Sequence, residues 1–166
     1  MDARRHVLIL LCSLGLLAAL PAAAGAQVQE VAPDVAGLTI KPAKFKAAKT
    51  GPVVVTKGGA LVSFSLNGGA NVTFSLKSDV AGHKAGAKCV AGKPSKAKKQ
   101  KACSIVKDVK GTFTFPGISG PNELRISGRW GTFDTAATLK PGTYRLVAKA
   151  QGLAARSSFA RFTILK

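Results

Sequence analysis

Cys89 and Cys103 are the residues whose type and spacing most directly imply chemistry. The third cysteine, Cys12, lies in an apolar N-terminal run typical of an export signal, so two cysteines remain in an exported chain. An even pair in an exported protein predicts a disulfide. Closing a loop of this size should contribute roughly 3 kcal/mol to stability by the chain-entropy estimate. No second cysteine pair or histidine pair accompanies them, so no metal site is predicted.

The segment between these cysteines, Ala91–Lys101, is rich in lysine and is called the Lys-rich loop here. It has no large apolar side chain and is expected to be a disulfide-closed loop. Five lysines lie within nine residues: Lys93, Lys96, Lys98, Lys99 and Lys101. Lysine attracts polyanions as a point charge, so an anionic polysaccharide or wall polymer would bind promiscuously and in a salt-sensitive manner. The alternative is a solvated loop whose charges prevent aggregation and edge pairing.

Specific nucleic-acid binding and catalysis both lack the residues that they require. No aromatic side chain that could stack on a base lies between Phe74 and Phe113. The carboxylates are scattered and form no compact acid pair for glycoside hydrolysis. His83 has no Ser-centred elbow and no nearby oriented carboxylate. The sequence therefore predicts a protein that is not an enzyme and has no cofactor.

Trp130 and Phe133 form the second candidate site. They lie on or next to a predicted turn, Gly128–Gly131, where two rings could provide a platform for stacking sugars. That arrangement favours a carbohydrate-binding accessory domain as the alternative function. The competing interpretation is that Trp130 caps the hydrophobic core, because tryptophan is highly buried on average.

The N-terminus has the order of a secretory signal peptide. A basic start, Met1–His6, is followed by an apolar run, Val7–Leu20, and by Ala24-Gly25-Ala26. The run is shorter than the about 20 residues that a bilayer crossing requires. We therefore predict a signal peptide over 1–26, a flexible lead-in over 27–37 and one domain over 38–166. The expected location is secreted, extracellular or at the cell envelope, with no stable membrane span after cleavage.

The predicted mature chain is strongly basic. Cleavage removes two arginines and one aspartate, so the net charge falls from +18 to +17. Such a charge favours polyanionic neighbours without choosing among them, and it is equally compatible with a soluble basic domain that has no specific partner. The oligomeric state stays open.

Alternating apolar residues predict the elements that must position these groups. Val62, Phe64 and Leu66 alternate with serines, and the pattern recurs at Val72–Leu76 after a Gly-rich turn. These are expected to be consecutive strands, either a hairpin or a crossing between two sheets. Val80–Ala87 is expected to be flexible. About seven strands without a helix predict an all-β sandwich, with a small barrel as the alternative.

The residues Leu139, Pro141, Gly142 and Tyr144 lead into a further predicted strand. Pro-Gly is turn chemistry, and the spacing resembles the tyrosine corner of fibronectin type III and immunoglobulin-like sandwiches, in which the tyrosine hydroxyl bonds back to the chain before the turn. The alternative is an ordinary turn with a half-buried tyrosine.

From Leu38 to Leu165 the order of these pieces resembles immunoglobulin-like or fibronectin type III-like modules of secreted bacterial proteins. The resemblance implies a non-catalytic structural, adhesive or accessory binding role. Two departures stand out. Gln151–Arg156 replaces the Asp and Ala-Gly-Asn turn of many bacterial relatives, and the cysteines lie on one short loop instead of bridging two sheets.

Overall fold

The computed structural model describes residues 32–95, 100–132, 136–152 and 155–166. The predicted signal peptide, 1–26, and the first part of the predicted lead-in lie outside the described residues. Strand β1 (Val35–Lys41) begins three residues before the expected start of the domain. The lead-in predicted over 27–37 therefore ends in a strand.

The described residues form strands, turns and loops, and the all-β prediction is confirmed. They include no helix that could span a membrane. The first sheet has the order β1-β4-β8-β3, with all pairs antiparallel. Its other strands are β4 (Ala60–Leu66), β8 (Gly120–Ile126) and β3 (Val54–Val55).

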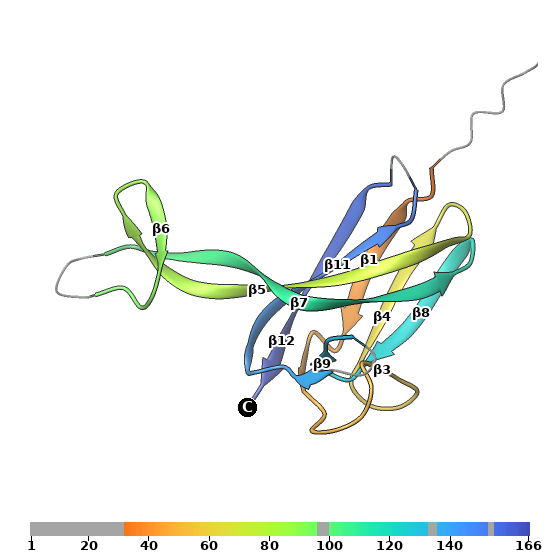
Figure 1. Cartoon of the computed structure of the whole chain (residues 1–166), viewed down its shortest axis with the longest axis horizontal. Coiled ribbons are helices and arrows are strands. Elements are labelled where there is room, and N and C mark those ends of the chain that lie inside the picture. Colours follow the sequence, from red (N-terminus) through yellow and green to blue (C-terminus); the bar gives the residue numbers. More distant parts are fainter. Residues whose placement is uncertain (1–31, 96–99, 133–135, 153–154) are drawn as a thin grey trace, which may run out of the picture. The chain divides into compact units, whose positions relative to one another are not determined.

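The second sheet has the order β2-β12-β11-β5-β6, and β7 also pairs with β5 (Figure 1). Its strands are β2 (Lys44–Lys46), β5 (Ala70–Ala85), β6 (Lys88–Ala91), β7 (Ala102–Gly117), β11 (Gly142–Ala150) and β12 (Ser157–Leu165). A separate two-stranded sheet consists of β9 (Arg129–Trp130) and β10 (Ala137–Thr138). Among the described residues, seven strands are seven residues or longer, and the others are shorter pieces.

Alternate residues of the two large sheets are buried in one shared hydrophobic core. On β4 these are Val62, Phe64 and Leu66, which face inward as predicted. Phe64 meets Phe74 of the second sheet edge-on, with ring centroids 5.7 Å apart. Each fully buried side chain of this size contributes roughly 1.5–3 kcal/mol by leaving water. This burial explains why the period-2 pattern predicts both strands correctly.

The turn at 67–69 carries the chain from one sheet to the other. Strand β4 pairs with β1 and β8, whereas β5 pairs with β11 and β7. Of the two arrangements that the sequence allows, the structure shows the crossing. The alternation is the same in both cases, because one face of each strand enters the core either way.

The prediction of a flexible segment at Val80–Ala87 is wrong, because β5 continues to Ala85. Its pairing with β11 ends at Asp79, but its pairing with β7 continues to His83. Beyond β11, residues 80–91 and 102–107 form a three-stranded extension, which we call the arm (Figure 1). Small residues have low strand propensity, and here backbone pairing on both sides of β5 overrides it.

Candidate functional site

The predicted disulfide between Cys89 and Cys103 is confirmed, with Cα atoms 6.1 Å apart. Cys89 lies on β6 and pairs with Lys84, whereas Cys103 lies on β7 and pairs with Gly82. The two cysteines are therefore on strands that flank β5, which corrects the expectation that both lie on one short loop. The bridge clamps the outer strands of the arm across its central strand.

Gly82 provides the space in which the bridge crosses β5. A Cβ atom at this position would lie 2.8 Å from Sγ of Cys89 and 2.7 Å from the carbonyl oxygen of Val90. No side chain fits without displacing one of them. Sequence reasoning missed this residue, although an isolated glycine inside a strand does indicate close approach of another part of the chain.

Hydrogen bonds also hold the two ends of the Lys-rich loop together. The amide of Lys84 donates to the carbonyl oxygen of Lys101 at 2.8 Å. Ser95 and Gln100 bond to each other twice: the Ser95 amide donates to Oε1 of Gln100 at 3.0 Å, and the Gln100 amide donates to the Ser95 carbonyl oxygen at 3.3 Å. These bonds join the chain segments that flank residues 96–99.

The lysines of the arm and of the described ends of the Lys-rich loop are exposed to solvent. Of the five predicted polyanion-binding residues, the structure describes Lys93 and Lys101, and both are exposed. Lys96, Lys98 and Lys99 lie outside the described residues. Three more lysines are exposed on the strands of the arm: Lys84, Lys88 and Lys107. Residues 82–107 include no acidic side chain that could neutralise them.

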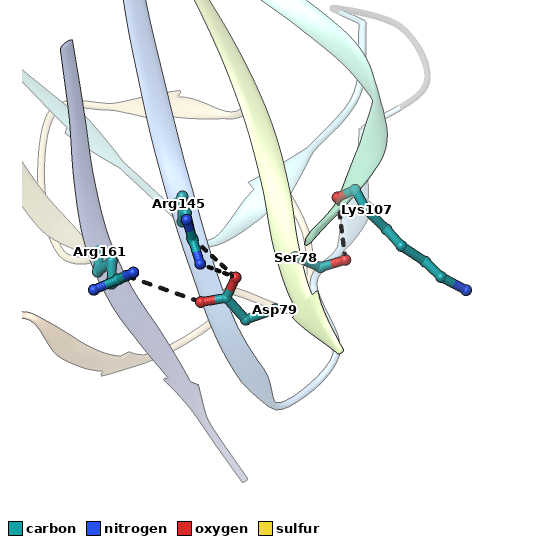
Figure 2. A network of polar contacts seen from close by, with 5 residues as sticks. All are labelled: Ser78, Asp79, Lys107, Arg145 and Arg161. Carbon is teal, nitrogen blue, oxygen red and sulfur yellow. Dashed lines mark hydrogen bonds and ion pairs between the residues drawn. The ribbon is translucent and has the colours of Figure 1, made fainter. Parts of the chain in front are cut away.

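The carboxylates closest to the arm in sequence are already paired with cations. Asp108 lies 3.1 Å from Nζ of Lys77. Asp79 is nearly buried, and its Oδ1 accepts a hydrogen bond from Nε of Arg145 at 2.9 Å. The same oxygen lies 2.8 Å from Nη2 of Arg145. Nε of Arg161 lies 3.9 Å from the other oxygen of Asp79 (Figure 2). This network joins β5, β11 and β12 at the point where the arm begins.

Tyr144 makes the hydrogen bond expected of a corner. Its hydroxyl donates to the carbonyl oxygen of Lys140 at 2.9 Å, and its ring stacks on Phe162 with centroids 5.6 Å apart. Leu139 is buried, and its amide donates to the carbonyl oxygen of Gly128 at 3.0 Å. Burial raises the pKa of the Tyr144 hydroxyl above its usual value of 10.0. The corner therefore fixes the entry to β11.

Trp130 belongs to the core. Its side chain is almost fully buried, its indole Nε1 donates to the carbonyl oxygen of Gly111 at 3.0 Å, and its ring meets Phe113 edge-on. It lies on the short strand β9, which corrects the predicted turn at Gly128–Gly131. A ring in this position offers no open face to a sugar. Phe133, the other half of the predicted platform, lies outside the described residues.

A cavity of ≈ 650 Å³ opens beside Trp130, between the middle of β7 and the tyrosine corner. Its described lining includes Lys110, Lys140 and Tyr144 but no carboxylate or imidazole. The described residues also include no cluster of three or more His, Cys, Asp or Glu side chains that could hold a metal ion. The described lining thus offers lysine amines and the Tyr144 hydroxyl, which already donates to Lys140, and it has no pair of groups for acid–base chemistry.

A scan against protein-family models finds no match to this chain, and a search of curated proteins finds none either.

Proposed function

We propose that this chain is an exported, non-catalytic module with an immunoglobulin-like or fibronectin type III-like sandwich fold. It serves a structural or adhesive role at the bacterial envelope or outside the cell, and it binds polyanions weakly through the Lys-rich loop. Two sheets on one core and the hydrogen bond between Tyr144 and Lys140 support the fold. The disulfide suits an oxidising compartment.

The observation that carries the binding role is that exposed lysines flank and enter a loop whose two ends are held in place. The arm is held by ladder hydrogen bonds and by the disulfide between Cys89 and Cys103, so the backbone of the two described loop ends, at Lys93 and Lys101, is positioned before a ligand arrives. Pre-organisation lowers the entropic cost of binding. Lysines supply charge without bidentate geometry, which favours low specificity and strong salt dependence.

The competing explanation is that the lysines keep the arm soluble and prevent its edges from pairing with other strands. Strand β7 pairs only with β5 among the described strands, so one of its edges needs such protection. Under this explanation, removing the lysines changes aggregation but not retention on an anionic resin.

Chromatography of the chain 27–166 on heparin resin distinguishes the two. One variant replaces five lysines of the loop with serine: Lys93, Lys96, Lys98, Lys99 and Lys101. The matched control replaces five exposed lysines elsewhere: Lys41, Lys49, Lys57, Lys140 and Lys166. Both variants lose the same charge. We expect the loop variant to elute at much lower salt than the control.

Equal losses in the two variants would show that net charge alone causes retention. An unchanged loop variant would show that the Lys-rich loop does not bind polyanions. In either case the binding role of the loop would be rejected, and the structural role would have to be tested separately.

A further inference from the structure

The outward face of the second sheet is an ordered array of polar side chains with one exposed aromatic ring. Inward residues of β5, β11 and β12 enter the core, so the residues between them point to solvent. The pairing register aligns them in four rows across the strands. The rows are Ser157–Lys149–Thr73, Phe159–Val147–Ser75, Arg161–Arg145–Lys77 and Thr163–Thr143–Asp79.

A groove of ≈ 630 Å³ lies on this face. Its lining includes hydroxyls of Thr73 and Ser75, the amide of Gln151 and the amines of Lys77 and Lys149. It includes no carboxylate. Hydroxyl and amide groups exchange hydrogen bonds with sugar hydroxyls, and amines pair with anionic groups. The groove is therefore chemically matched to a ligand that is rich in both hydroxyls and negative charge.

Phe159 stands beside this groove. Its side chain is 56% exposed, and it pairs across the strands with Val147, which lines the groove. The guanidinium carbon of Arg161 lies 6.0 Å from the centroid of its ring. The negative face of an aromatic ring attracts the weakly positive C–H groups of a sugar ring, and the neighbouring guanidinium can pair with a carboxylate.

The acidic groups of this face are already engaged. Asp79 is held by Arg145 and Arg161, and the exposed Asp108 pairs with Lys77. The short contacts to Asp79 hold the guanidinium of Arg145, whereas Arg161 lies 3.9 Å from Asp79 and stays largely exposed, and the face is net positive. A carboxylated ligand thus meets positioned cations and little repulsion.

The hydroxyl and amide groups in the groove lining distinguish this ligand from other polyanions. An anionic bilayer would offer headgroups to the cations of this face but no sugar ring to stack on the exposed Phe159. Single-stranded nucleic acid requires a series of stacking rings, and Phe159 is the one strongly exposed aromatic side chain among the described residues.

We propose that the outward face of β5, β11 and β12 binds a uronate-containing oligosaccharide. One sugar ring stacks on Phe159, its neighbours lie in the groove against Thr73, Ser75 and Gln151, and carboxylates pair with Lys149 and Arg161. The site is separate from the arm, and its ligand is recognised by shape and hydrogen bonds as well as by charge.

Calorimetric titration of the chain 27–166 with oligogalacturonate tests this proposal. The buffer contains enough salt to suppress charge-driven binding by the Lys-rich loop. We expect saturable binding, absent with neutral malto-oligosaccharides of the same length. Phe159→Ala and Lys149→Ser should each weaken it about five- to tenfold, in line with the loss of one stacking contact or one charge-assisted hydrogen bond. The five-lysine loop variant should bind as the parent does.

The outcomes separate this site from the arm. A loop variant that loses heparin retention but keeps oligogalacturonate supports the proposal whatever the role of the arm. Equal binding of the neutral sugar, an unchanged Phe159→Ala variant, or binding only to anionic phosphatidylglycerol vesicles would each overturn it. Emission from the buried Trp130 verifies that each variant is folded.

Discussion

At the scale of single residues, the hydroxyl of Tyr144 shows how burial couples structure to pH. The protonated hydroxyl donates to the carbonyl oxygen of Lys140, and burial disfavours the phenolate. Because the pKa is raised in the folded state, the contribution to stability is complete below pH about 10 and is lost as pH rises through the folded pKa.

This chain has one tyrosine, so its titration can be measured without overlap from others. We expect absorbance at 295 nm to titrate above pH 10 in the folded protein and near pH 10 in concentrated urea. Tyr144→Phe should cost about 0.5–1.5 kcal/mol at neutral pH, the net value of one hydrogen bond. Identical titration curves in the two solvents would contradict the buried corner.

Gly82 is the second residue whose role can be tested alone. A methyl group there would collide with Sγ of Cys89 and with the backbone of Val90. We expect Gly82→Ala to cost about 1–3 kcal/mol through overpacking and to leave a fraction of the thiols unpaired after refolding. Thiol alkylation and mass spectrometry would measure that fraction. Gly86→Ala is a control for the added methyl, because nothing lies within 4 Å of a Cβ at that position, although its positive φ adds backbone strain.

At the scale of elements, the arm depends on the disulfide more than the two sheets do. Strand β11 supports β5 only as far as Asp79, and beyond that point the arm is held by its own three strands and the bridge. We therefore expect the arm to open locally at a lower free-energy cost than the two sheets.

Replacing both Cys89 and Cys103 with serine tests this division. We expect amides of 80–91 and 102–107 to lose most of their protection from hydrogen exchange, while β11 and β12 keep theirs. The arm would lose most of the loop-closure stabilisation of about 3 kcal/mol that the disulfide provides. Equal loss of protection in β11 would mean that arm and sheets unfold as one unit.

Asp79 holds three strands together at the base of the arm. Asp79→Asn would leave Arg145 and Arg161 without their carboxylate while keeping the side-chain volume. We expect a cost of about 1–2 kcal/mol, less than for a fully buried pair, because both arginines retain contact with water. Urea denaturation measures it, and Asp108→Asn is the control, since its exposed pair with Lys77 should contribute little.

At the scale of the whole molecule, the shared core of the two sheets provides most of the stability. Phe74 is fully buried, between Phe64 of the opposite sheet and Phe113 of the neighbouring strand. Phe159, on β12 of the same sheet, lies on the opposite face and is exposed. The same residue type therefore occupies both faces of one sheet.

This contrast gives a matched pair of substitutions. Phe74→Ala should cost about 3–5 kcal/mol, through lost transfer energy and a cavity. Phe159→Ala should change stability by less than about 0.5 kcal/mol. Urea unfolding followed by emission from Trp130, the one tryptophan, measures both. Similar costs would contradict the assignment of the inner and outer faces.

Local periodicity and pairwise chemistry are sufficient to predict several features of this fold. Alternation at Val62–Leu66 and Val72–Leu76 predicts strands and their buried faces, and the even cysteine count predicts the disulfide. The spacing at Leu139–Tyr144 predicts a hydrogen bond from the tyrosine back to the chain before the turn, and the structure identifies the acceptor as Lys140. Each of these follows from residues close together in the chain or from a count.

The identity of neighbouring strands follows from the folded chain and not from local patterns. The crossing at 67–69, the ordered arm, the burial of Trp130 and the pairing of Asp79 with Arg145, 66 residues later, all depend on long-range pairing. A period of two is the same whichever strand lies alongside, so it does not identify the partner. Charges and rings acquire their roles from those partners, and for this reason the proposed oligosaccharide face became visible only in the folded chain.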